Sequence, residues 1–360
     1  MLLVIIILLQ IGITLYLIKA WIAIPNFNDE KEPYTQVTVV IAFRNEAANL
    51  VALVKELNAL QYPVGLLDII LVNDHSEDQG MQLLESCTFI HPTTVLNLPE
   101  GEFGKKKAIK FGVQHASSAL IVTTDADCHV LPSWVTVIAN FYQETNANFI
   151  AAPVIIASDG SMWQDMQQIE FASIIGTSAC LMENNKPVMS NAANMAFNRL
   201  IYNDFNQFLA PTVSGDDVFL MHHIHQQYPG AVRFLKSPKA TVFTNAAPTF
   251  ASFFEQRVRW AGKWTLYQDK FTKVMAILVW GIHLAIILAL FYLPLPLFLT
   301  LYFLKAIVDF LLLANVLGNS SIKIKKKSFL ILVVLYPFYV VIFGLISGHR
   351  KYNWKGRIVK

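Results

Sequence analysis

Hydrophobic residues are unevenly distributed along this chain. Residues 1–18 are apolar except for Gln10, and further apolar segments cover 274–293, 297–317 and 329–347. Each is close to the ~20 residues that a helix needs to cross the hydrocarbon core of a bilayer. Residues 30–270 mix polar and apolar positions instead. The pattern predicts a membrane anchor, a globular middle and a group of C-terminal membrane helices.

The globular middle alternates short apolar runs with stretches of helical periodicity. Apolar runs at 37–43 and 68–74 flank a helical stretch at 47–60, and a second helical stretch at 105–116 leads to the run at 119–127. This alternation predicts β-α-β units with buried parallel strands. In open α/β sheets, ligands bind at the carboxyl ends of the strands. We therefore look for chemistry where these runs end.

The same pattern predicts domain boundaries. We expect an N-terminal transmembrane anchor at 1–22, a globular α/β domain at 35–270, transmembrane or interfacial helices at 274–348 and a basic tail at 349–360. The anchor has no basic stretch before it and no small-residue cleavage site, so it is expected to be retained. Three C-terminal spans would put the basic loop at 323–327 and the basic tail on opposite sides. One of these segments is therefore a candidate for a re-entrant or interfacial helix.

Composition supports a membrane protein and argues against some partners. The chain is 54% hydrophobic and 15% charged, whereas a soluble domain carries roughly 25% charged residues. Its net charge is +3, and its lysines form no stripe with interleaved aromatic residues, so we expect no nucleic-acid partner. Cys87, Cys128 and Cys180 are widely spaced, which argues against a disulfide framework.

Carboxylates stand at several of the expected strand and helix ends. Asp125 and Asp127 form a D-x-D triplet at the end of an apolar run, and two such groups can hold Mg²⁺ or Mn²⁺ together with substrate phosphates. Asp74 ends another run, so it should lie at the same sheet edge. Asp216 and Asp217 begin an expected helix, where a carboxylate can also serve only as a cap. A lone D-x-D triplet is a weak signal because surface turns often contain one.

Three further residues lie just before the first C-terminal membrane segment. Gln256, Arg259 and Trp260 occur in the sequence QRVRW. An arginine offers a fixed fork of donors to phosphate, and a tryptophan offers a flat face on which a sugar ring can stack. An arginine and tryptophan belt at a membrane interface is the other interpretation, and both can hold together.

Six segments, taken together, form an ordered series. They are VVIAFRNEAANL, ILVNDHS, GKKKAI, TTDADC, SGDDVFL and QRVRW, and they cover roughly residues 35–265. In this order they resemble glycosyltransferase family 2, in particular its membrane-embedded branch of cellulose synthases, ceramide glucosyltransferases and bacterial carotenoid glycosyltransferases. The resemblance implies an α/β fold of the GT-A type (Rossmann-like), flanked by transmembrane helices.

The resemblance also implies roles for individual residues. Asp74 would contact the nucleotide base, Glu46 would support the nucleoside, and Lys105 would lie near the nucleotide. Asp125 and Asp127 match the metal and diphosphate motif, in which Asp127 would be the direct ligand.

The remaining motif residues would serve the acceptor end of the site. Asp217 matches the family's general base, which removes a proton from the acceptor hydroxyl. Asp216 stands where the family more commonly has glutamate, which leaves open which of the two is the base. Gln256, Arg259 and Trp260 match the Q-x-x-R-W motif at the acceptor and diphosphate end.

These inferences together predict an inverting glycosyltransferase. It would move a hexose from a nucleotide-diphosphate sugar, with UDP-sugar favoured, to a hydroxyl of a lipid-like acceptor, using Mg²⁺ or Mn²⁺. We expect a multi-pass protein of the cell inner (cytoplasmic) membrane with its catalytic domain in the cytoplasm. Two alternatives stay open: a processive polysaccharide synthase of the cellulose or hyaluronan type, which usually has more spans, and a non-catalytic membrane protein that binds nucleotide sugars.

Overall fold

The computed structural model describes residues 1–205, 216–262, 266–346, 352–354 and 357–359. These residues form two compact units. One unit comprises Met1–Pro25, Ile156–Leu181 and Ala246–Lys360, and the other comprises Asn26–Ile155 and Met182–Asn245. We call them the helical unit and the α/β unit.

The α/β unit is built on a seven-stranded sheet in the order β3-β2-β1-β4-β8-β6-β9. Strands β1, β2, β3 and β4 are parallel neighbours, whereas β8 runs antiparallel to both β4 and β6. In sheet order, the strands are β3 (Thr93–Asn97), β2 (Leu67–Asn73), β1 (Val37–Phe43), β4 (Leu120–Thr123), β8 (Met195–Asn198), β6 (Phe149–Ala151) and β9 (Val232–Phe234). A second sheet joins β5 (Cys128–His129), β10 (Val242–Thr244) and β7 (Val154–Ile156).

Helices accompany this sheet along the chain. They are α2 (Ala47–Asn58), α3 (Gly80–Glu85), α4 (Lys105–His115), α5 (Trp134–Thr145), the 3₁₀ turn η1 (Ala192–Asn194), α7 (Arg199–Phe205) and α8 (Asp216–Gln227). Strand β1 is almost entirely buried along its length, which explains its continuous apolar run, because a parallel strand is covered on both faces. Helix α4 lies close to β1 and β2 because Gly112 has no side chain: a Cβ there would lie 2.5 Å from Val40 Cγ1.

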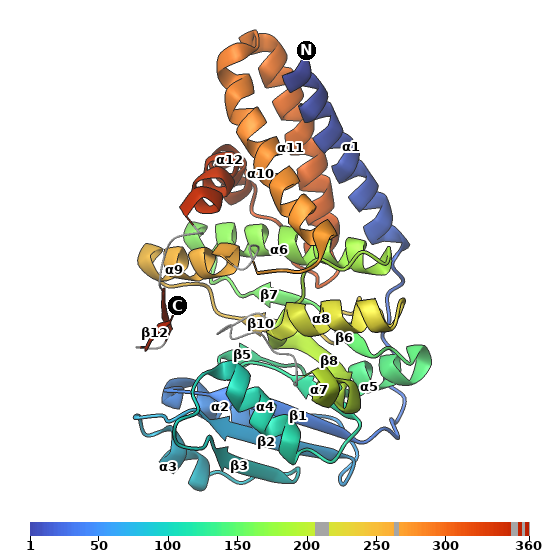
Figure 1. The fold of residues 1–360 in the computed structure, drawn as a ribbon, viewed down its shortest axis with the longest axis vertical. Helices are drawn as coiled ribbons and strands as arrows, with labels where there is room; N and C mark the ends of the chain where they lie inside the picture. The colour runs from blue at the N-terminus through green and yellow to red at the C-terminus, as the bar shows by residue number, and fades with distance from the viewer. Residues whose placement is uncertain (206–215, 263–265, 347–351, 355–356, 360) are drawn as a thin grey trace. The chain divides into compact units, whose positions relative to one another are not determined.

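The helical unit contains the long apolar segments. Among the described residues, the helices long and apolar enough to cross a membrane are α1 (Leu2–Ala23), α10 (Lys270–Tyr292), α11 (Leu295–Gly318) and α12 (Lys326–Ile346). In Figure 1, α1, α10 and α11 run side by side, whereas α12 is seen almost end-on. Helices α6 (Met162–Glu183) and α9 (Phe250–Ala261) lie crosswise to the bundle. A two-stranded ladder joins β11 (Tyr352–Trp354) to β12 (Arg357–Val359).

Apolar and polar contacts hold the bundle together. Ile7 of α1 is fully buried against a cluster that includes Ile286 of α10 and Phe298 of α11. Lys305 and Asp309, the two charged residues of α11, form an ion pair of 2.5 Å, and Lys305 is buried. Pairing one turn apart lets α11 keep both charges inside an apolar bundle.

Candidate active site

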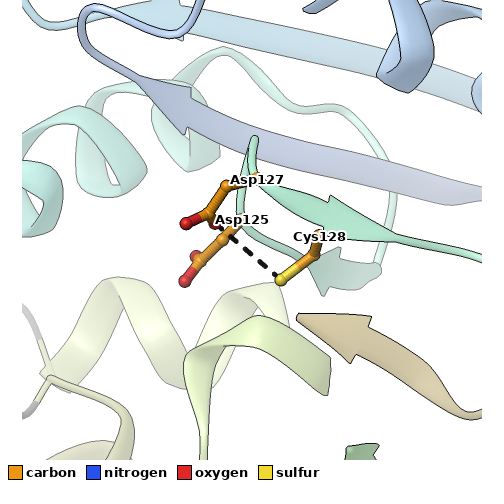
Figure 2. Close-up of side chains that lie close together, drawn as sticks. All are labelled: Asp125, Asp127 and Cys128. Atoms are coloured by element: carbon orange, nitrogen blue, oxygen red, sulfur yellow. Dashed lines mark hydrogen bonds between the residues drawn. The ribbon is translucent and has the colours of Figure 1, made fainter. Parts of the chain in front are cut away.

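The D-x-D triplet lies where β4 ends. This strand is fully buried between β1 and β8, and the chain turns after it with a hydrogen bond of 3.1 Å from the Cys128 N–H to the Asp125 carbonyl. The ligand atoms of Asp125, Asp127 and Cys128 lie within 4.8 Å of one another. Figure 2 shows the two carboxylates side by side. The predicted pair of carboxylates is therefore a real spatial cluster.

The electrostatics of this turn favour a cation on the oxygens. Burial, and then the neighbouring Asp125, raises the pKa of the Asp127 carboxyl above its ordinary value. Burial, followed by the two carboxylates, also raises the pKa of the Cys128 thiol far above its ordinary value. The thiol is therefore protonated at neutral pH, whereas the deprotonated thiolate is the form that binds metals. Two carboxylates with no thiolate make a donor set suited to a hard cation such as Mg²⁺ or Mn²⁺.

Lys105 joins the D-x-D turn to the start of α4. Its ammonium group forms an ion pair with Asp125, and both side chains are partly exposed. Gly104 precedes the helix with φ of 100°, a conformation that suits glycine. The Gly104 N–H donates a hydrogen bond of 3.0 Å to Asp74 Oδ2. Asp74 and Lys105, predicted to serve the nucleotide, thus meet at the beginning of α4.

Asp74 is 1% exposed and follows β2 directly. Its N–H donates to the carbonyl of Phe43 at the end of β1 (2.9 Å), and Arg44 Nη1 donates to its carbonyl oxygen (3.0 Å). Glu46 is buried at the start of α2, where its carboxylate accepts a hydrogen bond of 2.5 Å from Asn49. The carboxyl ends of β1 and β2 are thereby held together, as the parallel-sheet prediction requires.

A short relay connects Asp217 to the end of β4. Thr123, the last residue of β4, donates from its hydroxyl to the carbonyl of Ala192 (2.8 Å), and the Ala192 N–H donates to Asp217 Oδ2 (3.3 Å). Asp217 is 8% exposed, and its Oδ1 has no hydrogen-bond partner among the described residues. A buried carboxylate oxygen in this condition is costly. Asp216 begins α8, but its side chain lies outside the described part of the structure.

Gln256, Arg259 and Trp260 belong to the helical unit, on α9. Thr249 caps this helix in a reciprocal pair with Ser252, which satisfies backbone groups at its first turn. The ring of Trp260 lies 5.5 Å from that of Phe171 on α6. The predicted site residues are thus divided between the units: the acidic residues and Lys105 in one, the Q-x-x-R-W residues in the other.

Sequence reasoning missed residues that organise both groups. Thr123 and Ala192 gave no chemical signal, because their role is to connect segments that are distant in sequence. Arg257 occupies a position that the Q-x-x-R-W motif leaves unspecified, yet it is only 2% exposed. It lies four residues after Phe253, which is also buried. That spacing, on one helical face, is the signal that could have marked it as buried.

A family model and a curated relative match parts of this chain. Residues 38–204 match the sequence model of glycosyl transferase family 2. A dolichyl-phosphate beta-glucosyltransferase of Trichomonas vaginalis is 31% identical over 116 residues, which are 30% of this chain and 34% of that protein. The match therefore spans about a third of that relative.

A solved structure shares the fold over almost its whole length. The mannosyltransferase PcManGT from Pyrobaculum calidifontis, solved in complex with GDP-Man and Mn²⁺, has a TM-score of 0.63 to this chain at 15% identity. The likeness covers 96% of this chain and 98% of the other. At that identity the likeness concerns the fold, and it confirms the predicted GT-A architecture flanked by apolar helices.

Proposed function

We propose that this chain, whose residues 38–204 match the model of glycosyl transferase family 2, is an inverting enzyme that transfers a hexose to a lipid-like acceptor. The donor is a nucleotide-diphosphate sugar, with UDP-sugar favoured, and the acceptor presents a hydroxyl group. The reaction takes place at the cytoplasmic face of the cell inner membrane. The observation that carries this proposal is the set of acidic groups around the end of β4.

The residues at this edge can divide the work of the reaction. Asp125 and Asp127 would hold Mg²⁺ or Mn²⁺, which stabilises the negative charge that develops on the departing diphosphate. Asp74 and Lys105, joined through Gly104, would bind the nucleotide. Asp217 would accept the proton of the attacking hydroxyl, because its Oδ1 is buried and has no partner among the described residues. General-base assistance of this kind contributes ~10²–10⁴-fold.

A lipid phosphate is the alternative acceptor, because the Trichomonas vaginalis relative is named a dolichyl-phosphate beta-glucosyltransferase. A phosphate is already ionised at neutral pH and needs no base. A buried carboxylate would also repel it. The buried Asp217 therefore favours a hydroxyl acceptor over a phosphate.

A donor screen tests the proposal. Membranes containing the protein are incubated with radiolabelled UDP-glucose, UDP-galactose, UDP-N-acetylglucosamine or GDP-mannose and Mn²⁺, and the lipids are then extracted. We expect an organic-soluble product whose label survives mild acid, because an oxygen-linked glycoside is stable where a glycosyl phosphate is cleaved. Label released by mild acid would show a phosphate acceptor, and label in an insoluble polymer would show a processive synthase. No donor turnover would contradict enzymatic function.

A further inference from the structure

Arg257 lies inside the Q-x-x-R-W segment and forms a buried ion pair. Its partner is Glu170 of α6, and the two residues are 2% and 4% exposed. Arg257 Nη2 lies 2.6 Å from Glu170 Oε2, and Arg257 Nε lies 3.3 Å from Glu170 Oε1. This two-point geometry fixes the orientation of the guanidinium plane as well as its place.

A third helix completes the arrangement. Tyr339 of α12 donates from its hydroxyl to Glu170 Oε1 over 3.1 Å. The carboxylate of Glu170 therefore connects α6, α9 and α12 at one point. On α9, the Arg257 guanidinium also lies over the ring of Phe253, with its Cζ 4.5 Å from the ring centroid.

The guanidinium of Arg257 also meets two residues of the motif. Arg257 Nη1 donates a hydrogen bond to Gln256 Oε1. The Arg257 Cζ lies 4.3 Å from the centre of the Trp260 ring, a cation–π contact. A residue that the motif leaves unspecified thus touches two of the three residues that it specifies.

A gain in folding stability does not explain this buried ion pair. Removing an arginine and a glutamate from water costs about as much as their attraction returns, and apolar replacement of both is often neutral or stabilising. The directional contacts to Gln256 and Trp260 are what apolar side chains could not supply. We propose that Glu170, Arg257 and Tyr339 act as positioning residues, which fix Gln256 and Trp260 for the acceptor end of the transfer.

This inference rests on the proposed function, and its first test uses the double substitution Glu170→Met/Arg257→Met. Methionine fills a similar volume and leaves neither charge unpaired. We expect an unfolding temperature close to that of the wild type in detergent. With UDP-glucose or GDP-mannose, whichever the wild type uses, and Mn²⁺, we expect kcat to fall about 10- to 100-fold. The KM for the donor should stay within about twofold of the wild-type value, because the substitutions remove no contact with the donor.

Two further variants separate positioning from packing. Arg257→Lys keeps the charge but lacks the planar guanidinium fork. Of the kcat that the Met/Met variant loses, the Arg257→Lys variant should therefore retain less than half. Arg233→Met is the matched control, since Arg233 pairs with Glu183 at 3.0 Å in the α/β unit, and its kcat should equal that of the wild type. A Met/Met variant with the kcat of the wild type would overturn the proposal, as would full rescue by Arg257→Lys.

A second measurement needs no turnover. The chain has seven tryptophans, which can be labelled as 5-fluorotryptophan and observed by ¹⁹F NMR, with the Trp260 signal assigned through Trp260→Phe. We expect that signal to shift and broaden in the Met/Met variant and to stay in place in Arg233→Met. An unmoved Trp260 signal would overturn the positioning role. A wild type that uses none of the donors would instead contradict the proposed function and leave the NMR result to decide this inference.

Discussion

A partly buried carboxylate such as Asp127 costs stability unless something there balances its charge. Burial and Asp125 raise the pKa of the Asp127 carboxyl in the folded chain. The folded state then binds protons more readily than the unfolded state, so stability falls as the pH rises through the folded pKa. At neutral pH the metal-free turn carries this cost, and a cation bound to Asp127 would offset it.

This balance predicts a pH-dependent effect of Mn²⁺ on unfolding. Mn²⁺ should raise the unfolding temperature more at about pH 7.5 than at about pH 5, because protons compete with the metal for Asp127 at the lower pH. Differential scanning fluorimetry in detergent measures both shifts. Asp127→Ala should show no Mn²⁺ shift and no transfer activity. Asp159→Ala, at an exposed aspartate, should keep both the Mn²⁺ shift and the transfer activity of the wild type. An undiminished Mn²⁺ shift in Asp127→Ala would exclude this residue as a ligand.

Oδ1 of Asp217, which has no hydrogen-bond partner among the described residues, leads to a separate prediction. Asp217→Asn keeps the shape of the side chain and can still accept the hydrogen bond from Ala192, but it can no longer take a proton. We expect donor affinity to stay unchanged while kcat falls by ~10²–10⁴-fold. Calorimetric titration with the donor and Mn²⁺, together with steady-state rates, measures the two effects. If Asp216→Asn has the larger effect on kcat, the base is Asp216.

At the scale of elements, the hydrophobic pattern predicted the strands and helices whose positions depend on burial. The run at 37–43 became β1 with those bounds, and the helix expected at 105–116 is α4, Lys105–His115. Parallel order also placed Asp74 and Asp125 at the same edge of the sheet, after β2 and β4, the two strands that flank β1. The ion pair of Lys105 with Asp125 could not be predicted, because it depends on where α4 begins relative to the turn after β4. The relay through Ala192 could not be predicted either, because it depends on how η1 and α8 return to the sheet. Burial pattern carries no information about such returns.

The contact of α4 with the sheet leads to a prediction for Gly112→Ala. The new Cβ would lie 2.5 Å from Val40 Cγ1 and 3.0 Å from Val72 Cγ2, so α4 must shift away from β1 and β2. We expect a loss of about 1–3 kcal/mol of stability, more than the gain in helix propensity of up to about 1 kcal/mol. Donor affinity should fall too, because α4 begins with Lys105.

Thermal unfolding with and without donor measures both effects of Gly112→Ala. Gly281→Ala in α10 is the matched control, because a Cβ there meets no atom within 4 Å. It should be neutral or slightly stabilising. Equal behaviour of the two variants would contradict the close packing of α4 against the sheet.

At the scale of the whole molecule, α12 decides the membrane topology. Tyr302 of α11 donates to the Val333 carbonyl (2.6 Å), and Trp280 of α10 donates to the Val341 carbonyl (3.2 Å). Helix α12 is thus attached to both neighbours, yet it does not run alongside them (Figure 1). The sequence predicted an interfacial segment as one possibility, because three C-terminal spans would put the basic loop at 323–327 and the basic tail at 349–360 on opposite sides of the membrane. An interfacial α12 removes that conflict.

We therefore predict three membrane spans, with the α11–α12 loop and the C-terminus both on the side of the α/β unit. Single cysteines can be introduced as Ser321→Cys and Lys360→Cys, with Lys55→Cys marking the α/β unit and Tyr292→Cys the opposite side. Cys87 is first changed to serine, because the other two native cysteines are buried. A membrane-impermeant maleimide should label Ser321→Cys, Lys360→Cys and Lys55→Cys in inside-out vesicles and Tyr292→Cys in intact spheroplasts. If Lys360→Cys is labelled in spheroplasts instead, α12 crosses the bilayer as a fourth span.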